Sequence, residues 1–137
     1  MCGGDTNFIR VWDMNRELYK DYPTEVNSGI TSIATSDQYT VAGFGNGSLR
    51  LFDFRCPTAS QSSFVRGRTQ PSFYQHESYV LKVKFNKTNT HRLVSAGVYG
   101  GINVFDMRTL KSELNAPFNR EFITALECHP FSDLIAV

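Results

Sequence analysis

The sequence predicts an all-β fold that is built from several similar sheets. A short phrase recurs three times in the 137 residues, at 4–13, 45–53 and 99–106. Each copy is a Gly-rich turn followed by an alternating strand that ends in an aromatic residue and an aspartate. Helical periodicity is not sustained anywhere in the chain. The chain is therefore expected to consist of strands joined by short turns.

The spacing of the phrase is typical of WD40 repeats. The first two closing aspartates lie 40 positions apart, and the first copy ends in Trp12-Asp13. A period near 40 with this ending marks one blade of a β-propeller, a sheet of about four strands. Alternating segments that suit the first and second strands of successive blades keep step with the aspartates. These segments are 30–34, 80–85 and 123–128 for the first strand, and 39–43, 92–97 and 134–137 for the second.

Residues 1–137 are therefore expected to form a partial WD40 repeat region, with about two full blades and two part blades. Closed propellers need about four to eight blades. We thus expect a piece of a longer propeller whose outer blade faces lack their neighbours. The expected parts are the end of one blade at 1–25, a blade at 26–75, a blade at 76–118 and the start of the next at 119–137.

A polar insertion at about 56–73 explains the longer spacing of 53 between the second and third aspartates. Part of it, about 64–73, must supply the fourth strand of its blade, and the rest is expected to be a surface loop. A tolerated loop expansion is the favoured interpretation. The alternative is regulation by phosphate groups placed beside two arginines. The residues concerned are Thr58, Ser60, Ser62, Ser63, Arg66 and Arg68.

Composition argues against several classes of function. A net charge of +1 disfavours electrostatic nucleic-acid binding, and no apolar run approaches the length of a membrane span. Cys2, Cys56 and Cys128 form no Cys-x-x-Cys pair, so neither a disulfide framework nor a zinc site is indicated. We expect no metal or cofactor and a reducing compartment, with Cys128 as a small buried apolar residue.

Many WD40 blades carry a hydrogen-bonded set of His, Ser or Thr, Asp and Trp. The third copy has His76 and Ser95, but Tyr99 and Phe105 stand at the Asp and Trp positions. The set is therefore expected to be broken here. Phe105 is interpreted as a core residue, and His76 as a turn histidine with local partners rather than a ligand or a base.

The other two copies lack a complete set as well. The second has Asn46 and Phe52 at the Asp and Trp positions, and Val26 where His would fall. The first retains Asp5 and Trp12. We therefore expect Phe52 to be a core residue and these blades to depend on packing.

Two adjacent copies place an arginine two residues after the closing aspartate, at Arg55 and Arg108. Such Asp-x-Arg boxes resemble those of WD40 substrate receptors of cullin-4 ubiquitin ligases, although Phe replaces the preceding Trp. A structural Asp–Arg pair at the blade rim is the favoured interpretation, and a protein-interaction role for both arginines is the alternative. No catalytic motif is present, so we expect no enzyme.

Four segments together resemble the Raptor family, the scaffold subunits of target-of-rapamycin (TOR) complex 1. These segments are 3–17, 41–55, 74–77 and 126–136, with the Phe-Asp endings and Trp12-Asp13-x-x-Arg16-Glu17 as their more specific features. The resemblance implies a non-catalytic scaffold that binds the TOR kinase, Rag GTPases and substrates. It also implies a cytoplasmic protein that is recruited to lysosomes. The insertion at 56–73 departs from the family in length and composition.

The first hypothesis is therefore an interaction platform in nutrient-responsive TOR signalling. The alternatives are a substrate receptor of a cullin-4 ubiquitin ligase or a generic WD40 interaction platform. A propeller hydrolase ranks well behind them, because converging acids or histidines at strand starts are absent from the sequence.

Overall fold

The computed structural model describes residues 7–24, 26–37, 39–52, 72–117 and 122–137, and every regular element in them is a β-strand. The prediction of an all-β fold is confirmed. The strands are β1 (Phe8–Asp13), β2 (Leu18–Pro23), β3 (Ile30–Thr35), β4 (Thr40–Phe44), β5 (Ser48–Phe52), β6 (Ser72–Gln75), β7 (Val80–Phe85), β8 (Arg92–Gly97), β9 (Gly101–Asp106), β10 (Lys111–Pro117), β11 (Glu127–Cys128) and β12 (Ile135–Ala136).

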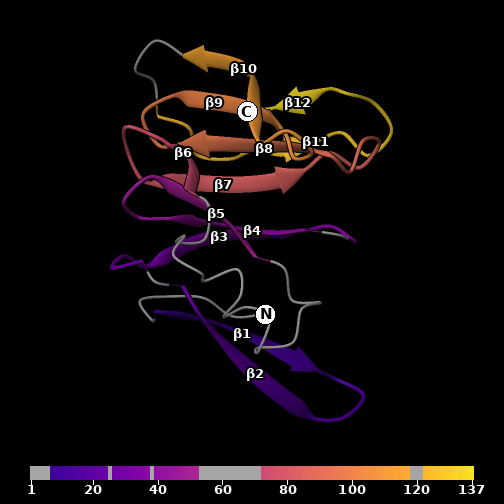
Figure 1. The fold of residues 1–137 in the computed structure, drawn as a ribbon. Coiled ribbons are helices and arrows are strands. Elements are labelled where there is room, and N and C mark those ends of the chain that lie inside the picture. Colours follow the sequence, from indigo (N-terminus) through magenta and orange to yellow (C-terminus); the bar gives the residue numbers. More distant parts are fainter. Residues whose placement is uncertain (1–6, 25, 38, 53–71, 118–121) are drawn as a thin grey trace.

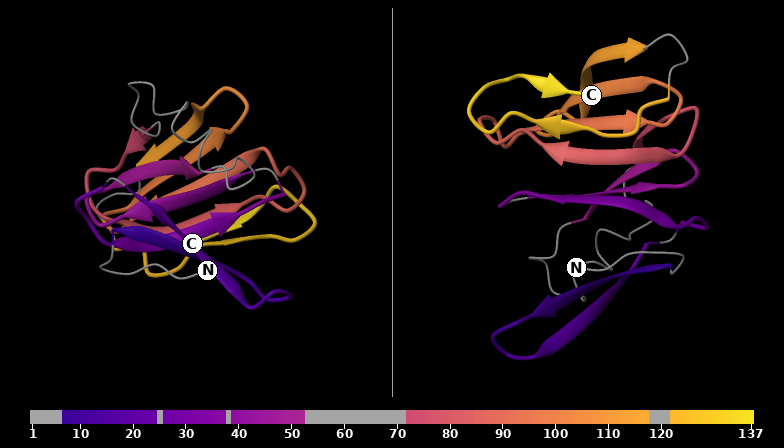
Figure 2. Two further views of the ribbon diagram at one scale, coloured as in Figure 1. Left: turned by 60° about the horizontal axis from the view of Figure 1, so that its bottom comes forward. Right: turned by 180° about the vertical axis from the view of Figure 1, so that it is seen from behind.

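The strands form four antiparallel sheets in which each strand pairs with its neighbour in the chain. The first sheet is β1-β2, the second β3-β4-β5-β6, the third β7-β8-β9-β10 and the fourth β11-β12. Figures 1 and 2 show the first three sheets stacked in chain order, with β11 and β12 beside the third. Meandering sheets of this kind, placed face to face, are blades of a β-propeller.

Glycines close the turns before β5 and β9. Gly47 and Gly100 adopt φ values of 85° and 87°, a backbone region that favours glycine. Their amides donate hydrogen bonds to the carbonyl oxygens of Phe44 and Gly97, at 3.0 and 3.2 Å. The predicted turns are therefore present in the second and third copies of the phrase, while the glycines of the first copy lie outside the described residues.

Three apolar clusters fill the spaces between successive sheets. Adjacent residues of a strand point to opposite faces, so Val41 packs toward the third sheet and Ala42 toward the first. The second and third sheets are thus covered on both faces. The first cluster contains Ile9, Val26, Ile30, Ala42, Phe44 and Phe52, and the last contains Val94, Ala96, Ile102, Ile123, Leu126 and Cys128.

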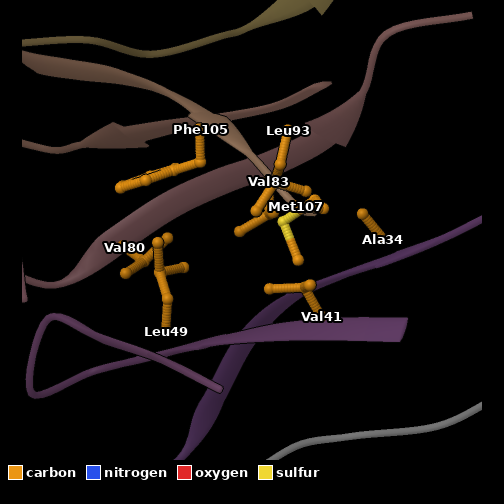
Figure 3. Packing of buried hydrophobic residues seen from close by; sticks show 8 residues of the cluster. All are labelled: Ala34, Val41, Leu49, Val80, Val83, Leu93, Phe105 and Met107. Atoms are coloured by element: carbon orange, nitrogen blue, oxygen red, sulfur yellow. The ribbon is translucent and has the colours of Figure 1, made fainter. Parts of the chain in front are cut away.

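The cluster between the second and third sheets lies at the centre of the molecule. Figure 3 shows side chains from both sheets pointing toward one another. Its buried members are Ala34, Val41, Leu49, Val80, Val83, Leu93, Phe105 and Met107. A hydrogen bond joins the same two sheets, because the Val83 amide donates to the buried Ser32 Oγ at 3.0 Å. Packing and a satisfied backbone donor therefore act together here.

The predicted core residues are confirmed, since Phe52, Phe105 and Cys128 are all buried. Trp12, which occupies the same position of the repeated phrase as Phe52 and Phe105, lies in the first sheet. It is 50% exposed and packs on Tyr19. The insertion lies outside the described residues up to position 71. Its last two positions, 72 and 73, belong to β6, the fourth strand of the second sheet.

The close approach of the second and third sheets makes Gly43 a sensitive position. A Cβ at Gly43 would lie 2.5 Å from Val80 Cγ1 and 2.8 Å from Val80 Cβ, and Val80 is fully buried. We expect Gly43→Ala to lower the free energy of unfolding by about 1–3 kcal/mol through overpacking. Urea denaturation of the full chain would measure the change.

Gly45→Ala provides the matched control. A Cβ at Gly45 would lie 3.0 Å from Ser28 Oγ, a short side chain that can rotate away, and at an ordinary contact distance of 3.8 Å from the Gly29 carbonyl oxygen. We expect a clearly smaller loss of stability. Equal losses in the two variants would contradict the proposed contact with Val80.

Candidate interaction site

His76 joins the second sheet to the third. It follows β6 directly, and its amide donates to the Gly47 carbonyl oxygen at 2.8 Å. Its ring Nε2 lies 2.8 Å from Ser95 Oγ on β8, and its Nδ1 lies 3.5 Å from Asn103 Nδ2 on β9. The main chain of His76 is therefore bound to one sheet and its ring to the next.

The His76–Ser95 contact of the expected set is present, while its Asp and Trp are missing as predicted, with Tyr99 and Phe105 at those positions. The ring of His76 is buried and its partners are distant in sequence, so it is not a turn histidine with local partners. Tyr99, expected at the Asp position, is 61% exposed, while Asn103 lies beside the ring. Burial lowers the pKa of His76 to about 4, so the imidazole is neutral at pH 7.

A different pair occupies the equivalent joint between the first and second sheets. Thr24 follows β2 as His76 follows β6, and its amide donates to the Asn7 carbonyl oxygen at 2.9 Å. Arg50, at the position of Asn103 in the repeated phrase, donates through Nη1 to the Thr24 carbonyl oxygen at 3.1 Å. The counterpart of His76 is thus Thr24, and the prediction of Val26 from spacing was wrong. Val26 belongs instead to the apolar cluster between these sheets.

Two closing aspartates of the phrase, Asp13 and Asp106, bind the turns that follow their strands, and the third, Asp53, lies outside the described residues. Asp13 Oδ1 accepts hydrogen bonds from the amides of Asn15 and Arg16, and Asp106 Oδ1 accepts one from the amide of Arg108 at 2.8 Å. The Arg108 guanidinium also binds the Asp106 carboxylate, at 3.1 and 3.2 Å. These hydrogen bonds lower the pKa of Asp106.

The structure therefore contains an Asp106–Arg108 pair within one turn. The Arg108 side chain is 64% exposed. Arg55 lies outside the described residues. The suggested interaction role of the two arginines stays a prediction.

A polar network that the sequence did not reveal joins the third and fourth sheets. The Asp133 carboxylate accepts hydrogen bonds from Asn86 Nδ2 at 2.8 Å and Thr88 Oγ1 at 3.0 Å, and it pairs with Arg92 at 3.4 Å. The Asn86 and Thr88 hydrogen bonds lower the pKa of Asp133. Asp133 lies more than 40 positions from each of these three partners, so no local motif could have indicated the contact.

A cavity of about 480 Å³ opens beside the His76 joint. Asn103 lies at this cavity and is 1% exposed, and its Oδ1 has no hydrogen-bond partner among the described residues. The lining side chains are mostly polar. They include His76, Glu77, Tyr99, Asn103 and Asn115.

Neither a metal-binding cluster nor a membrane-spanning helix occurs in the described part of the chain. No group of three or more His, Cys, Asp or Glu residues there lies close enough to hold a metal ion. That part also lacks a helix of the length and hydropathy required to cross a bilayer.

Stability should depend on pH through His76. The folded chain binds a proton at this ring only near pH 4, whereas the unfolded chain binds it near pH 6.5, so acidification through this window favours unfolding. We expect the midpoint temperature of thermal unfolding to decrease as the pH is lowered from about 7 to about 5. His76→Leu should cost about 1–3 kcal/mol at pH 7 because Ser95 loses its buried partner, and it should show a smaller fall on acidification.

His129→Leu is the control for this measurement. His129 is exposed and follows β11 in the chain, and it does not contact the His76 joint, so the variant should keep the pH dependence of the unmodified chain. An unchanged pH dependence in His76→Leu would show that another group is responsible.

Sequence comparison relates this chain to subunits of TOR complex 1. It is 28% identical over 99% of its length to the target of rapamycin complex 1 subunit mip1 of Schizosaccharomyces pombe. It is 31% identical over 98% of its length to the regulatory-associated protein of TOR 1 of Arabidopsis thaliana. It is 33% identical over 77% of its length to subunit KOG1 of Saccharomyces cerevisiae. The chain spans 7–10% of these relatives, and no protein-family model matches it.

Structural comparison agrees with the sequence. The crystal structure of Chaetomium thermophilum Raptor matches 94% of this chain with a TM-score of 0.78 and 25% identity, over 12% of the Raptor chain. A chain of the Mitotic Checkpoint Complex also matches with a TM-score of 0.78, over 97% of this chain and 39% of its own length, but its 13% identity shows the fold alone. The predicted resemblance is confirmed: sequence and fold together place this chain in the Raptor family.

Proposed function

We propose that this chain is a non-catalytic interaction module within a subunit of TOR complex 1. The observation that carries the proposal is its relation, over nearly its whole length, to proteins named as subunits of that complex. The module would provide a surface that binds other proteins of the assembly, and it would not catalyse a reaction. The TOR kinase is the partner that this assignment implies first.

The architecture supports such a role. The second and third sheets are covered on both faces by apolar packing, so they form a rigid base. The turns between their strands project from this base, and polar side chains such as Glu77 and Arg108 lie exposed on them. Loops held by a rigid scaffold are the usual carriers of binding residues.

Rag GTPases and TOR substrates are further partners that follow from the proposed membership. Binding to Rag GTPases would bring a cytoplasmic complex to the lysosomal surface. These assignments rest on the family resemblance and belong to the same proposal.

The alternative function, a substrate receptor of a ubiquitin ligase, would require Arg108 to contact a partner protein. A ligase receptor would need the guanidinium to face its adaptor, whereas here it binds the Asp106 carboxylate of its own turn. This geometry favours a structural role for the pair. The interaction-module proposal is therefore preferred.

Affinity purification tests the proposal directly. We expect the full-length protein that carries this chain, tagged in its own cells, to recover the TOR kinase. Arg55→Ala combined with Arg108→Ala should leave this recovery within about twofold of the unmodified protein, because an exposed ion pair contributes little to stability. Quantitative mass spectrometry of the purified complexes would measure both.

Phe105→Asp is the variant that should abolish the contribution of the module, because it places a charge in the central core. Absence of the kinase from the unmodified protein would contradict the proposal. Recovery of a cullin-4 adaptor that disappears in the double arginine variant would instead establish the alternative.

A further inference from the structure

The cavity beside the His76 joint has the chemistry of a cation site. Its charged lining residue is Glu77, and no lysine or arginine lines it among the described residues. His76 adds no charge at pH 7, because burial lowers its pKa to about 4. Among the described residues, the lining therefore offers a negative charge without a compensating positive one.

A buried polar group in the wall of the cavity is a hydrogen-bond acceptor that lacks a donor among the described residues. Asn103 Nδ2 lies toward His76 Nδ1, which leaves Oδ1 as the free atom of the amide. A buried acceptor without a partner costs free energy until a donor reaches it. Asn115 pairs with Asn103 across β9 and β10, so a second amide lies beside the first.

An aromatic ring lies at the same cavity. Tyr99 is exposed, and its ring packs on Phe122 with centroids 5.5 Å apart. The Tyr99 amide is also bound to Ser78 Oγ at 3.3 Å, which ties this turn to the segment after His76. A supported aromatic face beside a carboxylate favours a cation that can stack on it.

The repeated phrase points to the kind of cation. The positions equivalent to Asn103 are Arg10 and Arg50, and Arg50 donates to the chain of the preceding sheet at its joint. Asn103 is shorter and carries no charge, and it lines the cavity. The joint between the second and third sheets therefore lacks the guanidinium that its counterpart contains.

We propose that this cavity binds the guanidinium group of an arginine side chain from a partner protein. Its several donors would reach Asn103 Oδ1 and the Glu77 carboxylate together, while its planar face stacks on Tyr99. A lysine ammonium is a compact charge that cannot stack in this way or span separated acceptors. A volume of about 480 Å³ accommodates such a side chain.

This inference rests on the proposed interaction role and names the chemistry of one partner segment. It concerns the cavity alone, so a small probe tests it without the complex. The probe is Nα-acetyl-L-arginine amide, titrated into the full chain and followed by NMR at the Asn103 side-chain amide. We expect a dissociation constant on the order of 1 mM.

Two further probes test the selectivity of the cavity. The citrulline analogue has the same shape without the charge and should bind at least about tenfold more weakly. The lysine analogue should also bind more weakly, because it cannot reach both acceptors. Equal binding of either analogue, or no binding of the arginine probe, would overturn the proposal.

Exposed-residue variants keep the test independent of folding. Glu77→Gln should weaken binding of the arginine probe about fivefold by removing the ion pair, and Tyr99→Leu should weaken it by removing the ring. Glu17→Gln makes the same chemical change on the distant β1–β2 turn and should leave binding unchanged. Equal affinities for Glu77→Gln and the unmodified chain would overturn the site. Recovery of the TOR kinase is measured separately, so failure of this site leaves the proposed function standing.

Discussion

The contact between β3 and β7 is the constraint on which the rest of the structure depends. Both strands lie at the edge of a sheet, where backbone donors lack a partner within the sheet. The Val83 amide meets this need by donating to Ser32 Oγ, while Val80 fills the space beside Gly43. The Val83 amide needs an acceptor, and the Val80 side chain leaves no room for a residue larger than Gly43. Together these two contacts determine how the two central sheets face each other.

The same repeated phrase builds two chemically different joints. Between the first and second sheets, Arg50 reaches across to the Thr24 carbonyl oxygen. Between the second and third, the neutral ring of His76 lies between Ser95 and Asn103. The backbone pattern is retained while the side chains differ. Sheets that pack mainly through apolar clusters can therefore vary their polar joints, and a change at one joint can leave room for a ligand.

Much of the fold could be predicted from local patterns. Alternation located the buried strands, the glycines located turns with positive φ, and the apolar environment of Phe52 and Phe105 followed from their place in the phrase. The site was less accessible to this reasoning. Val26 was predicted as the counterpart of His76 because each lies four positions before the start of the next strand, β3 or β7. The loop before β3 is two residues longer than the loop before β7, so this equal spacing does not give equivalent positions. Only the register of β2 against β1 identifies Thr24 as the counterpart.

The sequence by itself determined the class of fold and the blade-like repeat, because periodicity and turn chemistry are properties of short segments. The resemblance of four segments to the Raptor family was also present in the sequence alone. The tertiary structure alone decided which polar groups meet. His76 reaches Ser95 across 19 positions, and Asp133 reaches Asn86 across 47. Such pairings depend on how whole sheets stack, and so does the unpaired Asn103 Oδ1. A hydrogen bond between residues distant in sequence produces no repeating pattern in the sequence, since it requires only that the folded chain brings the two side chains within bonding distance.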